Sequence, residues 1–74
     1  MVTNKGRIDI VIELADSVYL FEFKLNGTKE QALEQIKSND YAQKYQGTTK
    51  QVILIGVEFD KETRNVGEWI ISEP

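Results

Sequence analysis

Two short apolar runs, separated by three residues, constrain the fold of this chain more than any other feature. In the first run, from about Arg7 to Leu14, isoleucine or leucine occupies every second position, which is the period of a half-buried strand. The second run, Val18 to Leu25, is rich in the aromatic and branched side chains that strands favour. The link Ala15–Ser17 is short enough for a hairpin. The sequence therefore predicts two antiparallel strands.

The register of this hairpin decides where its polar side chains lie. A slip by one residue would turn every side chain to the other face, so only registers that pair the isoleucine face with the aromatic face are tenable. A two-residue turn at Ala15–Asp16 sets Asp9 opposite Glu22, and a turn one residue later sets Asp9 opposite Lys24. In either register Asp9, Glu22 and Lys24 converge on one side of the sheet, within cross-strand reach.

The segment after the hairpin predicts a broken helix. Thr28 and Gln31 form a capping-box pattern that starts a helix. The apolar stripe changes phase further on, so we expect a kink near Ser38–Asn39, where Asn39 or Asp40 caps a second short helix. Gly47 ends that second helix.

The last third of the chain predicts two further strands. Val52–Val57 is apolar on both faces, which is typical of an interior strand reached through a helical crossover. A polar turn precedes Arg64–Ile71, and this segment is predicted to form a last strand that pairs with the one before it. The order is strand, strand, kinked helix, strand, strand, which indicates an α+β fold with a mixed sheet and a single domain over residues 1–74.

Composition limits the possible function classes. The chain has no cysteine and no histidine, so any metal must be held by oxygen ligands, which favours Mg²⁺ or Mn²⁺. No stretch is apolar enough to span a bilayer or to act as a signal peptide, which predicts a cytoplasmic protein without membrane contact. A core of 74 residues is marginal, so we expect a homo-oligomer or part of a larger protein. The net charge of −3 argues mildly against an autonomous nucleic-acid binder.

The converging side chains suggest metal-assisted phosphodiester hydrolysis. Two carboxylates beside a core repel each other unless a cation compensates, and Mg²⁺ accepts carboxylates, a backbone carbonyl and phosphate oxygens. The ligands would be Asp9, Glu22 and the carbonyl of Phe23, and Lys24 would hold the attacking water or stabilise charge on phosphorus. The simpler interpretation is that Glu22 and Lys24 form a surface ion pair, which is common at this spacing.

Several blocks of the sequence together resemble the PD-(D/E)XK nuclease superfamily, and more narrowly the nuclease-like domain at the C-terminal end of certain bacterial AAA-ATPase-like proteins. The blocks are Gly6–Glu13, Tyr19–Lys24, Ala32–Ile36 with Tyr41 and Tyr45, and Val52–Val57 with Phe59 and Trp69. The resemblance implies a restriction-endonuclease-like core. It also implies that Asp9 and Glu22 are metal ligands, that Lys24 is the catalytic lysine, and that Gln35 faces the site from the helix.

Other residues that match the family pattern have simpler roles. Tyr41 and Tyr45 are expected to pack on the helix face, Glu13 to face solvent at the strand end, and Arg7 to contact phosphate or pair with Asp9. The family core begins with a helix and a further strand that this chain lacks, so the resemblance implies a domain truncated at its N-terminus.

Three interpretations follow. The first is a Mg²⁺-dependent nuclease domain that hydrolyses DNA, since Asp9, Glu22 and Lys24 are all present. The second is an inactive remnant of the same fold that serves in assembly or nucleic-acid binding, which the missing N-terminal helix and the acidic balance favour. The third is a small unrelated α+β protein with a surface ion pair, which would leave the convergence of Asp9 to coincidence.

Overall fold

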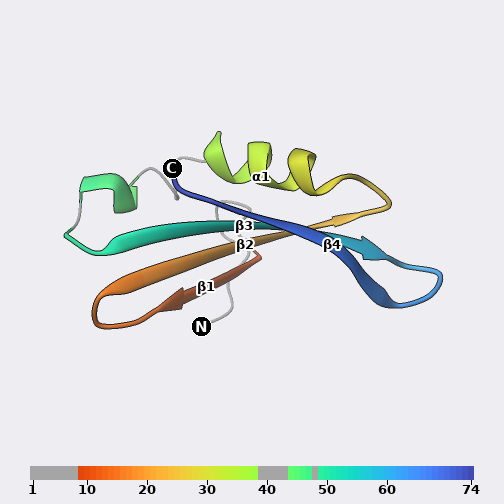
Figure 1. Ribbon diagram of the computed structural model, residues 1–74, viewed down its shortest axis with the longest axis horizontal. Coiled ribbons are helices and arrows are strands. Elements are labelled where there is room, and N and C mark those ends of the chain that lie inside the picture. Colours follow the sequence, from red (N-terminus) through yellow and green to blue (C-terminus); the bar gives the residue numbers. More distant parts are fainter. Residues whose placement is uncertain (1–8, 39–43, 48) are drawn as a thin grey trace.

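The described residues form a four-stranded sheet with one α-helix on one face (Figure 1). The computed structural model describes residues 9–38, 44–47 and 49–74. In chain order its elements are β1 (Ile10–Glu13), β2 (Ser17–Leu25), α1 (Lys29–Lys37), the 3₁₀ helix η2 (Lys44–Gly47), β3 (Gln51–Asp60) and β4 (Asn65–Ser72). The predicted order of elements and the α+β class with a mixed sheet are confirmed.

The spatial order of the strands is β1-β2-β3-β4, which makes β2 a central strand. β2 is antiparallel to β1 and parallel to β3, and β4 returns antiparallel to β3. In the first hairpin Ile10 faces Phe21 and Ile12 faces Tyr19, and the Leu14 N–H donates to the Ser17 carbonyl at 2.8 Å. This is the register of the two-residue turn, which sets position 9 opposite position 22.

The observed strands differ in length from the predicted ones. β3 runs to Asp60 instead of ending at Val57, because its parallel ladder with β2 continues past the apolar run and pairs Glu58 with Lys24. The ladder closes where the Asn26 N–H donates to the Phe59 carbonyl at 3.1 Å. In the first strand the regular part is Ile10–Glu13, and the predicted start at Arg7 lies outside the described residues.

The helix begins as predicted. The Gln31 N–H donates to Thr28 Oγ1 at 3.1 Å and the Thr28 N–H donates to Gln31 Oε1 at 2.9 Å, which completes a capping box. α1 ends at Lys37 with Ser38 as its C-cap, so the break near Ser38–Asn39 is confirmed.

The second helical segment is only partly described. The 3₁₀ helix η2 ends at Gly47, as predicted for the second helix. The proposed caps Asn39 and Asp40 lie outside the described residues.

The core lies between α1 and the face of β2 that carries Val18, Leu20 and Glu22. It does not lie on the face with the aromatic residues Tyr19, Phe21 and Phe23, which are only half-buried. Leu20 and Ile36 are fully buried in the core. Tyr45 joins this cluster, so its predicted packing role is confirmed. The cluster comprises Val11, Val18, Leu20, Leu33, Ile36, Tyr45, Val52 and Leu54. No helix in the described part of the chain has the length and apolar character needed to cross a membrane.

Gly56 on β3 allows α1 to approach the sheet closely. A Cβ atom at this position would lie 2.5 Å from the Lys29 carbonyl oxygen and 2.8 Å from the Leu33 nitrogen. Both are backbone atoms of the helix, which cannot move without shifting α1 itself. The absence of a side chain at Gly56 therefore sets the distance between helix and sheet.

We expect Gly56→Ala to lower the free energy of unfolding by about 1–3 kcal/mol, because an added methyl group would push α1 off the sheet. Urea denaturation followed by circular dichroism measures this. Gly47→Ala is the matched control, since a Cβ atom there would meet nothing within 4 Å. Equal effects of the two substitutions would contradict this account of the packing.

Candidate functional site

Asp9 lies just before β1 and is bonded to β2 by both its backbone and its side chain. Its N–H donates to the Phe21 carbonyl at 3.2 Å, and its Oδ2 accepts the Phe23 N–H at 2.8 Å. The N–H and C=O groups of one strand residue point to the same side, so the Phe23 carbonyl is directed toward the β1 side, where this carboxylate lies. The side-chain bond fixes the Asp9 carboxylate at the end of the hairpin.

Glu22 is a buried carboxylate on the helix side of the sheet. Its exposed fraction is 5%, its neighbour on β3 is Gly56, and its Oε1 atom is buried without a hydrogen-bond partner. Burial raises the pKa of Glu22 from 4.5 to about 7; the negative charge of Asp9 adds to this rise, and the charge of Lys24 opposes it. An unsatisfied buried carboxylate beside a second carboxylate is costly for the fold.

Lys24 is held by the helix and not by Glu22. Its Nζ atom donates to Gln35 Oε1 of α1 at 3.4 Å. Among the described residues the ion pairs are made by Lys29 and Lys50, and none joins Glu22 to Lys24. The interpretation of these two residues as a surface ion pair therefore does not fit their arrangement.

Gly27 makes room for the lysine, a role that its sequence context does not reveal. The sequence marks it only as a residue that breaks a strand. In the structure, a Cβ atom at Gly27 would lie 2.4 Å from Lys24 Cγ and 2.7 Å from Gln31 Oε1. The aliphatic part of Lys24 thus passes directly over the Gly27 backbone on its way to Gln35.

The remaining candidate residues lie apart from these contacts or cannot be placed. Glu13 pairs with Lys50 at 2.7 Å and is half-exposed, as expected for a solvent-facing strand end. Tyr45 packs in the core. Arg7 and Tyr41 lie outside the described residues.

The residues at this site fit a hard cation. The described residues contain no group of three or more carboxylates placed to hold a metal. The Asp9 and Glu22 carboxylates, with the Phe23 carbonyl, nevertheless offer oxygen ligands of the kind that Mg²⁺ combines with water and phosphate. A cation held by these residues would compensate the repulsion of the carboxylates, and Glu22 Oε1, which lacks a hydrogen-bond partner, would be available to bind it.

Comparison with known proteins shows the family of this chain. The sequence model of the PD-(D/E)XK nuclease superfamily matches residues 1–69. A protein of Azotobacter chroococcum mcd 1, called "Uncharacterized protein in vnfD 5'region", is 39% identical over 72 residues, which are 95% of this chain and 14% of the relative. No solved structure matches the chain. The mixed sheet with one helix between β2 and β3 is consistent with the predicted restriction-endonuclease-like core.

The raised pKa of Glu22 predicts how stability depends on pH. Between pH 4.5 and about 7 the unfolded chain has released the Glu22 proton while the folded chain retains it. The free energy of unfolding should therefore fall as pH rises through this window, by at most about 3 kcal/mol. Glu22→Gln should remove this part of the pH dependence and be more stable than the wild type at pH 8.

Urea denaturation of both proteins in EDTA, from pH 4.5 to 8, checks this. Glu34→Gln, on the exposed side of α1, serves as the control and should follow the wild-type curve. Parallel curves for wild type and Glu22→Gln would show that Glu22 is not the group responsible.

Proposed function

Because this chain belongs to the PD-(D/E)XK nuclease superfamily, we propose that it hydrolyses phosphodiester bonds of DNA in a reaction that depends on Mg²⁺ or Mn²⁺. The observation that carries the proposal is the buried Glu22 Oε1, which has no hydrogen-bond partner among the described residues although Asp9 lies close enough to raise the pKa of Glu22. The chain spans 14% of the length of its curated relative. Whether a longer protein containing this chain has the same activity is therefore also part of the proposal.

The proposed ligands are the Asp9 and Glu22 carboxylates and the Phe23 carbonyl. A divalent cation bound there would polarise a phosphate oxygen and lower the pKa of a coordinated water. The hydrogen bond from Phe23 N–H to Asp9 Oδ2, at 2.8 Å, orients the carboxylate, which would hold a cation through its remaining lone pairs. The cation would allow Glu22 to remain ionised at neutral pH despite its burial.

Lys24 is the proposed catalytic residue for the transition state. In hydrolysis, water oxygen forms a bond to phosphorus, the bond from phosphorus to the leaving oxygen breaks, and the water proton ends on solvent or the leaving group. Negative charge grows on the phosphoryl oxygens during this exchange, and a positioned ammonium stabilises it. Gln35 would act as a positioning residue, because it holds Lys24 Nζ and leaves that group two further protons to donate.

A second candidate function is a catalytically inactive module for assembly or nucleic-acid binding. It is favoured by two findings: the described residues contain no group of three or more carboxylates placed to hold a metal, and the net charge is −3. The cytoplasmic location remains a prediction. Metal dependence and loss of cleavage in single variants separate the two candidates.

We expect Lys24→Ala to abolish cleavage of plasmid DNA in Mg²⁺ while metal-induced stabilisation survives, because the lysine acts on the transition state and not on the cation. The loss should be at least about a hundredfold, the usual effect of removing one such donor. Lys37→Ala, in the exposed last turn of α1, is the matched control and should cleave normally. Cleavage that persists in EDTA or in Lys24→Ala would rule out this mechanism.

Asp9→Asn tests the metal site without requiring a substrate. In the wild type, Mg²⁺ or Mn²⁺ at a hundredfold excess over its dissociation constant should stabilise the fold by about 2.7 kcal/mol. Asn can still accept the Phe23 N–H, and it removes the charge that repels Glu22. The metal-free variant should therefore be at least as stable as the wild type and should lose most of the metal-induced gain.

Melting curves at constant ionic strength, with and without millimolar Mg²⁺, measure this difference. Asp16→Asn in the exposed hairpin turn is the control and should keep the full response to metal. A wild-type midpoint that does not move with Mg²⁺ would favour the inactive module.

A further inference from the structure

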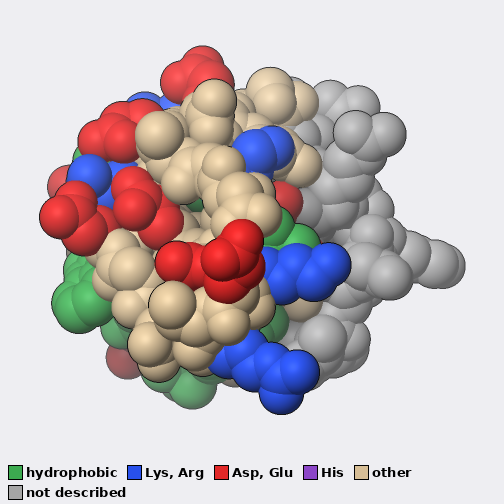
Figure 2. All heavy atoms as spheres, turned by 90° about the vertical axis from the view of Figure 1, so that its right-hand side faces the viewer, with side chains coloured by type: hydrophobic (Ala, Val, Ile, Leu, Met, Phe, Trp, Pro, Cys, Tyr) green, Lys and Arg blue, Asp and Glu red, His purple; other side chains and the backbone are tan. Residues whose placement is uncertain are grey.

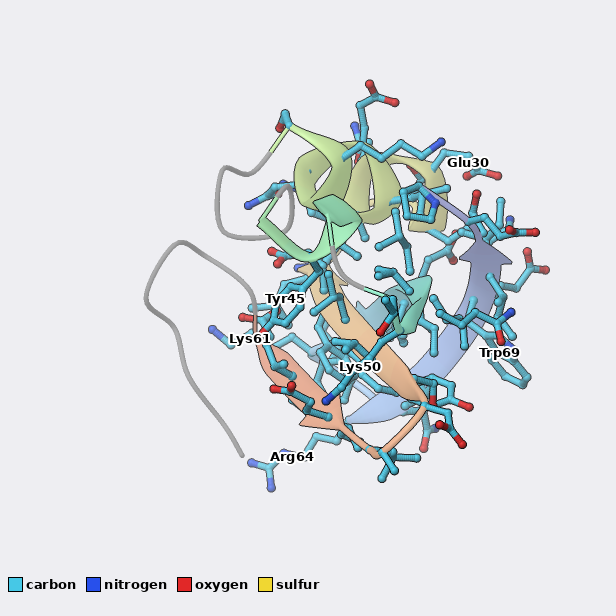
Figure 3. The ribbon with its side chains drawn as sticks, turned by 90° about the vertical axis from the view of Figure 1, so that its left-hand side faces the viewer. Glu30, Tyr45, Lys50, Lys61, Arg64 and Trp69 are labelled. Carbon is cyan, nitrogen blue, oxygen red and sulfur yellow. The ribbon has the colours of Figure 1, made fainter. Side chains whose placement is uncertain are left out.

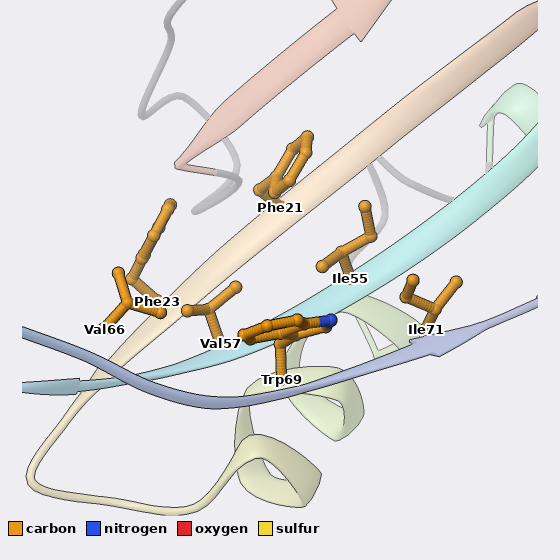
Figure 4. A pocket seen from close by; sticks show the side chains of 7 residues that line it. All are labelled: Phe21, Phe23, Ile55, Val57, Val66, Trp69 and Ile71. Carbon is orange, nitrogen blue, oxygen red and sulfur yellow. The ribbon is translucent and has the colours of Figure 1, made fainter.

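The face of the sheet opposite α1 is a continuous apolar surface. Side chains of β2, β3 and β4 point to this side and line a groove of about 310 Å³, while the helix lies behind the sheet (Figure 4). The groove is lined chiefly by Phe21, Ile55, Val57, Val66, Trp69 and Ile71. Ile10 and Ile12 of β1 extend the same surface, because they pair with Phe21 and Tyr19.

Charged side chains are segregated away from this apolar face. Glu22 and Lys24 alternate with the aromatic residues of β2, and their partners on β3 are Gly56 and Glu58. Glu68 of β4 pairs with Lys29 of the helix, so it also lies on the helix side. Figure 2 shows the end of the molecule with the β3–β4 turn, where acidic and basic side chains gather, while hydrophobic ones appear at one side and in gaps between them. Among the described residues, none of those that line the groove is a cation. A surface without lysine or arginine cannot neutralise phosphate, so we do not expect DNA to bind there.

The apolar face is open to solvent at its edge strand. Trp69 is 60% exposed, Ile71 61% and Val66 53%, and Trp69 projects outward from β4 (Figure 3). Exposed tryptophan and isoleucine gathered in one patch mark an interaction surface and not an ordinary monomer surface. Aromatic side chains in such a groove supply most of the affinity of an interface.

We propose that this apolar face is the interface between two copies of the chain. Four strands about 4.8 Å apart and about seven residues of about 3.3 Å rise give an apolar area of roughly 440 Å² in projection. Two such faces bury about 900 Å², and more when the relief of the side chains is counted, which reaches the ~1,000 Å² that a specific interface needs. A second copy supplies an equally large and uncharged surface.

The geometry suits a symmetric sheet-on-sheet contact. Two twisted sheets pack face to face with their strands about 30° apart, and in a two-fold dimer each Trp69 can enter the groove of the other copy. The side chains Glu22 and Lys24 point to the opposite face of the same sheet. The two candidate sites would therefore lie on the outer sides of the dimer, so dimerisation neither completes nor blocks them.

The single tryptophan reports on this contact directly. In a concentration series from low to several hundred micromolar, sedimentation velocity should show the mass rising from 8.5 kDa to twice that value. Trp69 emission should shift to shorter wavelength over the same range, because the half-exposed ring becomes buried. Added salt should leave the association unchanged or strengthen it, since it is apolar.

Trp69→Lys and Ile71→Lys should both be monomeric over the whole range, with wild-type circular dichroism. Ile71→Lys retains the tryptophan, whose emission should stay at long wavelength at every concentration. Glu34→Gln removes one negative charge on the exposed side of α1, so it changes the net charge by the same one unit as the lysine variants. It should dimerise normally. Lys24→Ala should also dimerise, so the interface can be tested whatever the outcome for nuclease activity.

A wild-type chain that remains monomeric at all concentrations would overturn the proposal. A monomer whose Trp69 emission is already at short wavelength would also overturn it, because another part of the same chain would then cover the face. Dimers that persist in both lysine variants would place the contact elsewhere on the molecule.

Discussion

The contact between α1 and Gly56 is the constraint on which the rest of this structure depends. Because Gly56 has no side chain, the helix backbone approaches the sheet to within contact distance and closes the core over Leu20 and Leu54. Gly56 is also the β3 neighbour of Glu22. The same close approach that builds the core therefore buries the carboxylate and brings Gln35 to Lys24.

Burying Glu22 at the candidate site lowers the stability of the fold. A small domain has little free energy to spare, and a buried carboxyl group without a hydrogen bond reduces it further. Protonation relieves part of this cost, because burial raises the pKa of Glu22 to about 7. The proposed cation would relieve it at higher pH. Local conflicts of this kind between stability and composition are typical of functional positions.

Much of the fold follows from local sequence pattern. The hairpin register, the capping box at Thr28 and the end of α1 near Ser38 are each set by short-range spacing, and each is observed. The candidate residues Asp9, Glu22 and Lys24 converge for the same reason, since they belong to one hairpin. Placing Gln35 beside them required the family resemblance, because helical spacing alone favours a solvent-facing position.

Three features were not accessible from local pattern because they depend on long-range contact. Both faces of β2 begin apolar, so periodicity could not decide which face the helix covers. The extension of β3 to Asp60 rests on pairing with β2 and not on its own composition. The role of Gly27 depends on the path of the Lys24 side chain, which is directed by its hydrogen bond to Gln35 of α1.

All four side chains of the candidate site come from one unbroken stretch of sequence, Asp9 to Gln35. The segments after it are η2 and the β3–β4 hairpin. They support β2 and the core, but they contribute no polar group to the contacts described for the site. Exposed loops that carry no such group tolerate insertions. The turn at residues 61–64 should therefore accept added segments of varied length, and relatives could diversify there while inheriting the site as one module.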